Sequence, residues 1–238
     1  MPMTTEGREH SASTSKLPSG IDGLDSMLGG GIPEGRVVLV LGEPGTGKTI
    51  LCSQYLHWGA TERNENGVFI GMNEPKSRLV TEMRDLGMDL ASLEKKRQFG
   101  YVDATEVRRI PEQARVGRIP VGGKELGLAI VLDSISDLVF RFPRIEERRP
   151  AILDIVEALQ STGATCLLTS ELLSTGETRR LQPEEYLAEG VIMLRIVRKG
   201  VRTIQISKMR GTKIDTAPRP FVIRDNGIEV LAREEVYA

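Results

Sequence analysis

The stretch "VVLVLGEPGTGKT", residues 37–49, constrains the fold of this chain more than any other. Five consecutive apolar residues end at Gly42, and the segment from Gly42 to Thr49 satisfies the pattern G-x-x-x-x-G-K-[ST]. The residues that follow, "ILCSQYLHWGA", repeat apolar side chains at helical spacing. The succession of buried strand, glycine turn and helix predicts a phosphate-binding loop between a sheet strand and a helix.

The loop residues suit a phosphate group for separate physical reasons. Glycines let the backbone curl so that amide N–H groups point inward at the positive end of the following helix. The Lys48 side chain would neutralise the β and γ phosphates, and the Thr49 hydroxyl would ligate magnesium. We prefer this interpretation to a glycine loop without a ligand. The expected nucleotide-binding residues of the loop are Gly42, Gly45, Thr46, Gly47, Lys48 and Thr49.

Three further apolar runs predict the rest of the sheet. They are "VFIGM" at 68–72, "LAIVLDS" at 128–134 and "TCLLTS" at 165–170, and each is apolar on both faces. Segments with helical periodicity lie between them, one after Pro75 and one starting near Pro150. Strands buried on both faces that alternate with helices indicate an α/β fold, with a mostly parallel sheet and helices on both of its faces.

The pattern changes after residue 190. The segments "VIMLRIVRKGVRTIQISK" and "FVIRDNGIEVL" each contain two strand patterns around a turn dipeptide, Lys199-Gly200 in the first and Asn226-Gly227 in the second. The sheet is therefore predicted to end in an antiparallel C-terminal hairpin extension.

A second metal ligand is expected at the end of a neighbouring strand. Asp133 follows the five apolar residues of "LAIVLDS", and a carboxylate at a buried strand end needs a partner, which magnesium provides. Taken alone, Asp133 would suggest the cap of the next helix, but beside the phosphate loop we favour the metal. Thr49 and Asp133 are thus the predicted magnesium ligands. Ser134 and Ser136 fit helix caps equally well, and no function is predicted for them.

Length and composition limit what surrounds this site. The 238 residues suffice for one well-buried domain, and residues 1–16 are too polar to order themselves, which predicts a flexible tail and one domain over 17–238. No apolar run is long enough to cross a bilayer, and a net charge of -1 gives no general attraction to nucleic acid or membrane. Cys52 and Cys166 lie far apart in apolar segments, which fits reduced thiols in a cytoplasmic protein.

Four segments carry the ordered motifs of one known family. They are "LPSGIDGLDSMLGGGIPEGRVVLVLGEPGTGKT", "LLTSELL", "EEYLAEGVIML" and "KMRGT" with the later "PFVIRDNGIEV". Together they resemble the KaiC-like branch of the RecA-type P-loop ATPases, over residues 16–232. The resemblance implies a RecA-type core, ATP with Mg²⁺ as the ligand, and a homo-oligomeric ring, expected to be a hexamer, with each nucleotide between adjacent subunits.

The resemblance also implies roles for residues late in the chain. Lys208 and Arg210 of "KMRGT" would reach the γ-phosphate of the neighbouring subunit's ATP, an arginine-finger arrangement. The alternative, from spacing alone, is a solvated cationic turn at the end of an edge strand. Ser170 and Glu171, at the end of "LLTSE", resemble the γ-phosphate-sensing position of the family, and Ser170 joins the expected nucleotide-binding residues.

The family usually places two acidic residues after the strand at 68–72, and the first resembles a base that activates water. Here the matched positions are Asn73 and Glu74. An amide cannot accept a proton from water, and neighbouring strand residues face opposite ways, so Glu74 takes the role only if the chain turns before Pro75. We therefore expect ATP binding with slow hydrolysis. The candidate catalytic residues are Glu74, Lys48, Lys208 and Arg210.

Two functions fit these features. The first is a ring-forming, ATP-binding regulator that acts on an unidentified protein partner, with a scaffold that hardly hydrolyses ATP as its limiting case. The second is a DNA-interacting ATPase in recombination or repair, based on a cationic segment at 105–124 that could touch phosphates. We favour the regulator, because no aromatic residue is interleaved there to stack on bases and a solvated loop fits equally well. The cationic residues are Arg108, Arg109, Arg115, Arg118 and Lys124.

Two departures limit the resemblance. The segment between "FGYVDA" and "LAIVLDS" is rich in Pro and Gly, so the expected crossover helix is short or missing there. The clock members of the family carry an adjacent Ser-Thr autophosphorylation pair where this chain has Glu185 and Tyr186. The resemblance therefore implies neither a clock nor an autokinase function.

Overall fold

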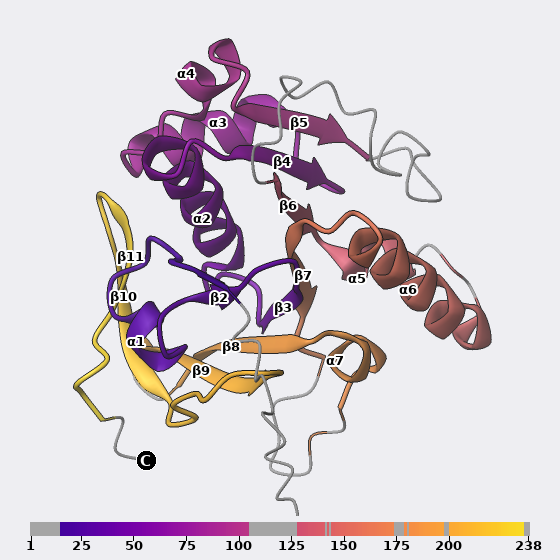
Figure 1. Ribbon diagram of the computed structural model, residues 1–238. Coiled ribbons are helices and arrows are strands. Elements are labelled where there is room, and N and C mark those ends of the chain that lie inside the picture. Colours follow the sequence, from indigo (N-terminus) through magenta and orange to yellow (C-terminus); the bar gives the residue numbers. More distant parts are fainter. Residues whose placement is uncertain are drawn as a thin grey trace, which may run out of the picture.

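The computed structural model is shown in Figure 1 and describes residues 15–104, 128–140, 142, 144–173, 179, 181–197 and 200–235. The cationic segment at 105–124, and with it the question of the crossover helix, lies outside these residues. The expected tail, residues 1–16, overlaps them only at Ser15 and Lys16, and Lys16 belongs to the first strand.

The strands follow the apolar runs of the sequence. They are β1 (Lys16–Leu17), β2 (Ile32–Pro33), β3 (Val37–Gly42), β4 (Asn66–Gly71), β5 (Phe99–Asp103), β6 (Leu128–Asp133), β7 (Thr165–Glu171), β8 (Gly190–Ile196), β9 (Arg202–Met209), β10 (Arg219–Arg224) and β11 (Gly227–Val230).

The helices lie mainly in the first three quarters of the chain. They are α1 (Leu24–Met27), α2 (Lys48–Glu62), α3 (Lys76–Asp85), α4 (Leu90–Lys95), α5 (Ile135–Phe140), α6 (Ile145–Gln160) and α7 (Pro183–Leu187). Within the described residues, no helix combines the length and the apolar composition that a membrane crossing requires.

The strands of the described chain form one large mixed sheet of nine strands, in the order β11-β10-β9-β8-β3-β7-β6-β4-β5, and β1 pairs separately with β2. β3 lies at the centre and pairs in parallel with β7 on one side and β8 on the other. β6, β4 and β5 continue the parallel part. β9, β10 and β11 follow β8 in antiparallel order. The predicted parallel core and antiparallel C-terminal extension are both confirmed.

Side chains of β3 alternate between two buried layers. Val38 and Val40 pack with Leu51 of α2 in a cluster to which α3 and α4 also contribute. Leu39 packs on the other side, in a cluster that includes Ile152 of α6. Helices therefore cover both faces of the sheet, as Figure 1 shows, and we call these the α2 face and the α6 face.

The second helix after β6, α6, starts earlier than its sequence pattern predicts. The pattern predicts a start near Pro150, whereas α6 begins at Ile145 and Pro150 lies inside it. Glu146 and Glu147 occupy the first turn, where carboxylates interact favourably with the positive end of the helix dipole. The charges of the first turn, rather than the proline, mark the beginning of this helix.

Gln54 of α2 ties the helix that follows the phosphate loop to both ends of the described chain. Its Nε2 donates to Gly20 O at 3.0 Å and to Ile228 O at 3.2 Å, and its Oε1 accepts from the Ile228 amide at 2.7 Å. Gly227, in the β10–β11 hairpin, has a φ of 104°, and a Cβ there would lie 2.4 Å from Gln54 Oε1. A larger residue at position 227 would clash with the Gln54 side chain, so glycine is required there. The hydrogen bonds of Gln54 to Ile228 then fix α2 against the hairpin.

Replacing Gln54 by alanine should lower the free energy of unfolding by about 2–4 kcal/mol, because it leaves a buried amide and two carbonyl groups without partners. Urea denaturation followed by circular dichroism measures the change. Gln205→Ala is the matched control, since Gln205 donates to Thr216 O at 2.9 Å on an exposed surface. Loss of this hydrogen bond in Gln205→Ala should change the free energy of unfolding by less than ~1 kcal/mol. Equal losses in the two variants would contradict the role of Gln54.

Candidate nucleotide-binding site

The glycine-rich loop lies at the carboxyl end of β3, and α2 begins at its Lys48. Gly45 and Gly47 have φ angles of 78° and 105°, which glycine adopts without strain. Thr46 closes the turn through its hydroxyl, which donates to Glu43 O at 2.8 Å. A Cβ at Gly45 would meet nothing within 4 Å, so the loop is open on that side. The first amides of α2 have no intrahelical acceptor, and an open loop before them suits an anion.

The Lys48 ammonium is held over the loop backbone. It donates to the carbonyl oxygen of Gly42 at 2.9 Å and to that of Glu43 at 3.1 Å. Burial lowers the pKa of Lys48, and the carboxylates of Asp133 and Glu171 oppose that shift. A partly buried cation beside an open loop favours an anionic ligand, which would compensate for the water it has lost.

Asp133 ends β6 and faces the first turn of α2. One carboxylate oxygen, Oδ2, accepts a hydrogen bond from the Thr49 hydroxyl at 2.7 Å, and the other accepts one from the Thr169 hydroxyl of β7. The two predicted magnesium ligands therefore contact each other. In the described part of the chain, no group of three His, Cys, Asp or Glu side chains could hold a metal alone. One hydroxyl and one carboxylate fit Mg²⁺, which takes its other ligands from phosphates and water.

The chain bends before Pro75, as a role for Glu74 requires. Asn73 is exposed and Glu74 is half-buried. The Glu74 carboxylate pairs with Arg78 at 3.2 Å. Burial raises the pKa of Glu74, nearby carboxylates including Asp133 add to the rise, and Arg78 opposes it. The Glu74 carboxylate thus lies close enough to that of Asp133, the predicted metal ligand, to interact with it. Its ion pair with Arg78, however, partly compensates the charge of Glu74.

Successive residues at the end of β7 point to opposite faces of the sheet. Thr169 points to the α2 face, where its hydroxyl bonds to Asp133. Ser170 points to the α6 face, where its hydroxyl donates to Glu184 Oε1 at 2.6 Å and lies 3.0 Å from the Ser136 hydroxyl. The structure therefore does not bring the Ser170 hydroxyl together with the phosphate loop.

Thr169 is the site residue that sequence reasoning missed. Its hydroxyl holds the Asp133 carboxylate from the side opposite to Thr49. Outer hydrogen bonds of this kind orient the ligands of a metal site. The sequence signal that could have identified Thr169 is the alternation of side chains along the strand "LLTSE", which places Thr169 and Ser170 on different faces of the sheet.

The "KMRGT" segment lies at the opposite end of the sheet from the phosphate loop. Met209 pairs with Gly190, and Gly190 pairs with Val38 near the start of β3, whereas the loop follows Gly42. Val38 and Gly42 are separated by roughly 13 Å of strand. The alternative interpretation of this segment assumed an edge strand, but β9 lies between β8 and β10. The separation from the loop runs along the strands rather than across the sheet.

Lys208 and Arg210 have different surroundings. The Lys208 ammonium donates to the carbonyl oxygens of Glu185, Tyr186 and Ala188, at 3.1, 3.3 and 2.6 Å, where α7 ends. Burial lowers the pKa of Lys208, and the charge of Arg210 adds to the effect. The Arg210 side chain is exposed. From this end of the sheet neither side chain approaches the loop of its own subunit.

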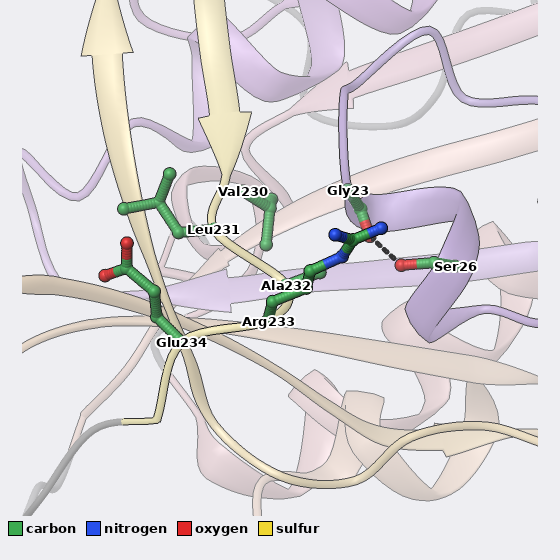
Figure 2. A pocket seen from close by; sticks show the side chains of 7 residues that line it. All are labelled: Gly23, Ser26, Val230, Leu231, Ala232, Arg233 and Glu234. Carbon is green, nitrogen blue, oxygen red and sulfur yellow. Dashed lines mark hydrogen bonds between the residues drawn. The ribbon is translucent and has the colours of Figure 1, made fainter.

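A hollow away from this site lies between α1 and the segment that follows β11 (Figure 2). Gly23 and Ser26 line one side, where the Ser26 hydroxyl donates to Gly23 O at 2.7 Å, and residues 230–234 line the other. Its lining residues include no part of the loop or of "KMRGT". We assign this hollow no part in nucleotide binding.

Comparison with known proteins gives a consistent result. A family model described as ATPase, KaiC, matches residues 17–235. The chain is 32% identical over 241 residues to the circadian clock oscillator protein KaiC of Synechococcus elongatus, covering 93% of this chain and 45% of that protein. It is 30% identical over 238 residues to the UPF0273 protein MJ1359 of Methanocaldococcus jannaschii, covering 90% of this chain and 96% of that protein. The chain thus spans about half the length of the clock protein and nearly all of the archaeal one.

A solved structure agrees with these relatives. The KaiC-like protein PH0186 from Pyrococcus horikoshii OT3 matches with a TM-score of 0.80 and 34% sequence identity, over 91% of this chain and 99% of that chain. Similarity of sequence and of fold therefore extends over most of the described residues.

Proposed function

This chain belongs to the KaiC family of ATPases and has a RecA-type fold, and we propose that it is an ATP-binding, slowly hydrolysing regulator that assembles into a ring. The observation that carries the proposal is the hydrogen bond of Thr49 to Asp133 beside a complete phosphate loop. It joins the two side chains that a magnesium ion needs, on the face of the sheet where α2 begins.

In this proposal the phosphates of ATP lie against the first turn of α2. The backbone around Gly45 and Gly47 supplies amides, and Lys48 supplies the cation for the β and γ phosphates. Thr49 and Asp133 would hold Mg²⁺, which neutralises charge on the phosphates when bound.

Hydrolysis would be slow because of Asn73. An amide cannot take the proton of the attacking water, and loss of the base from its usual position lowers the rate, by ~10²- to 10⁴-fold where no other group replaces it. Glu74 is the remaining acid of the matched pair, but its ion pair with Arg78 competes with a role as proton acceptor.

The proposal of a ring depends on the position of "KMRGT" in the fold. Arg210 is exposed at the end of the sheet opposite to the loop, so an arginine finger from Arg210, assisted by Lys208, would serve the ATP of a neighbouring subunit. A head-to-tail contact of this kind closes into a ring when its rotation allows. We propose a homo-hexamer.

In the proposed regulatory role, the nucleotide bound to the chain would control its contact with a protein partner. Residues 17–238 would act as one unit in the cytoplasm, where the buried free thiols of Cys52 and Cys166 stay reduced. Ser170 would respond to the γ-phosphate indirectly, through the end of β7 and its bond to Glu184. The nucleotide-dependent surface would then contact the partner.

Two further activities, a clock function and DNA interaction, are not proposed for this chain. The name of the Synechococcus relative refers to a clock oscillator, but this chain covers less than half of that protein and has Glu185 and Tyr186 in the matched phosphorylation segment. The DNA-interacting alternative rests on residues 105–124, which lie outside the described residues, and no contact in the described part favours it.

Lys48→Ala should weaken ATP binding by at least ~100-fold, because a charged hydrogen-bond donor to the phosphates contributes about 3 kcal/mol. Isothermal titration calorimetry with ATP and Mg²⁺ measures the affinity, and thermal denaturation checks the fold. Lys76→Ala is the matched control, since Lys76 pairs with Glu94 at the surface and should leave the affinity unchanged. Equal ATP affinity in Lys48→Ala and wild type would contradict the proposal.

Asn73→Glu should raise ATP turnover by ~10²- to 10⁴-fold, because it restores a proton acceptor at the matched position. Phosphate release at saturating ATP measures the rate. Asn73→Gln is the control, because it has the same length without the charge, and it should remain at the wild-type rate. If both variants keep that rate, or if Glu74→Gln abolishes a fast wild-type activity, the assignment of Asn73 is wrong.

Arg210→Ala should bind ATP nearly normally and lose turnover by up to ~10³-fold, since the finger acts on the transition state. Mixed in equal amounts with Lys48→Ala, both in an Asn73→Glu background, it should recover roughly a quarter of the activity, because random assembly joins an intact loop to an intact finger at that frequency. Recovery after mixing requires a finger that acts between subunits.

Sedimentation is the control for this experiment, because Lys48→Ala subunits that fail to bind ATP also have to enter the ring. Differently tagged subunits must be found in the same particle before the rates are compared. Absence of any recovery in rings shown to be mixed would exclude a finger in trans.

A further inference from the structure

Glu171 lies on the same face of the sheet as the phosphate loop. Thr169 and Glu171 are two residues apart on β7, so their side chains point to one face. Thr169 identifies that face, because its hydroxyl bonds to Asp133 beside α2. Ser170, between them, points the other way, to Glu184. Glu171 is therefore the residue of this strand end that faces the loop.

The register places Glu171 directly beside the first residue of the loop. Glu171 pairs with Gly42, and the next amide, that of Leu172, donates to Gly42 O at 3.1 Å. β7 is the neighbour of β3, whereas β4, which leads to Asn73 and Glu74, is the third strand from it. With ~4.8 Å between neighbouring strands, β7 lies roughly 5 Å from the strand of the loop and β4 roughly 14 Å.

The charges around Lys48 agree with this geometry. Among the described residues, the carboxylates that oppose the lowering of the Lys48 pKa by burial are those of Asp133, Glu171 and Asp137, in order of effect. Glu74 is not among the groups with the largest effects on this pKa. Glu171 is thus closer in electrostatic terms to the cation of the loop than the acid matched from the family.

Glu171 differs from the other two carboxylates in having no partner within the described residues. Asp133 accepts a hydrogen bond from Thr49, and Asp137 accepts one from the Ser134 hydroxyl. In the described part of the chain no hydrogen bond or ion pair involves the Glu171 carboxylate. Its lone pairs are available to a water molecule at the loop.

The backbone of Glu171 is nevertheless fixed. Its amide donates to the Ser136 hydroxyl at 2.8 Å, and its carbonyl oxygen accepts from Gln182 Nε2 at 3.0 Å. A side chain on a fixed backbone can be positioned without contacts of its own. Because both bonds involve the backbone, a substitution of the side chain leaves them in place.

We propose that Glu171 is the general base of the slow ATP hydrolysis of this chain, supplied by β7 in place of the carboxylate missing at Asn73. The inference rests on the proposed function. The oxygen of a water molecule bonds to the γ-phosphorus while the bond from that phosphorus to the bridging oxygen breaks, and the electron pair leaves with ADP. The proton of the water passes to the Glu171 carboxylate and then to solvent. The products are ADP, inorganic phosphate and one proton.

Glu171→Gln in the full chain tests the proposal. With saturating ATP and Mg²⁺, kcat should fall at least ~100-fold, because the proton acceptor is lost. The ATP affinity from calorimetry should stay within about a few-fold of wild type or become tighter, because a negative charge beside the phosphates is removed. Glu171→Asp should restore part of the rate. Glu62→Gln, which changes an exposed carboxylate at the end of α2, is the control and should keep the wild-type kcat.

The same substitution made in Asn73→Glu protein distinguishes a general base from a residue with a structural role. In Asn73→Glu protein the new carboxylate supplies a base, so adding Glu171→Gln should lower kcat by only about a few-fold, as expected when two groups share one task. A residue that merely supports the loop would lower kcat by the same factor in both backgrounds, and that result would overturn the proposal.

Three other outcomes would also overturn it. They are a wild-type kcat in Glu171→Gln, a larger loss in Glu74→Gln than in Glu171→Gln, and a loss of ATP affinity in Glu171→Gln that parallels the loss of rate. A wild-type chain that binds no ATP contradicts the proposed function itself. A wild-type chain that binds ATP and hydrolyses none contradicts both the hydrolytic part of that function and the base.

Discussion

The position of β3 between two parallel partners governs the rest of the structure. β3 is hydrogen-bonded on both edges, so its carboxyl end, where the loop begins, cannot move without breaking two ladders. The same pairing brings the end of β7 next to the loop and Asp133 of β6 one strand further. The start of α2, the Lys48 cation and the Thr49 and Asp133 oxygens of the candidate magnesium site are thereby assembled at one edge of the sheet, and Gln54 holds α2 over it.

Much of this arrangement could be predicted because its signals are local in the sequence. Runs that are apolar on both faces indicate parallel strands, and the loop motif indicates the strand end at which phosphate binding is expected. Gly200 and Gly227 have φ angles of 76° and 104°, so the turn dipeptides mark hairpins through a backbone conformation that glycine permits. A carboxylate that ends a buried strand needs a partner, and Asp133 has two, the hydroxyls of Thr49 and Thr169; its role as a magnesium ligand stays a prediction.

The remaining features depend on which way a side chain faces and on contacts between distant residues. Ser170 and Glu171 are adjacent, and only the register of β7 and the bond from Thr169 decide which of them faces the loop. The partners of Gln54 lie 34 and 174 residues away, at Gly20 and Ile228, and no local pattern indicates them. Spacing alone suggests an edge strand for "KMRGT", but the two strands that follow it in the chain, β10 and β11, are added to the sheet outside β9.

In the ring proposed above, Lys208 would place a thermodynamic condition on subunit association. An ammonium group has three donors, and those of Lys208 are directed to three carbonyl oxygens at the end of α7. Carbonyl groups at a helix end have no intrahelical amide to satisfy them. A Lys208 side chain that turned to a neighbour's phosphate would leave these carbonyls to water, so the subunit contact and the last turn of α7 compete for the same donors. In the proposed ring, association and the local unfolding of α7 would therefore be linked equilibria, and a change that loosens the helix end would also release Lys208 for the neighbour.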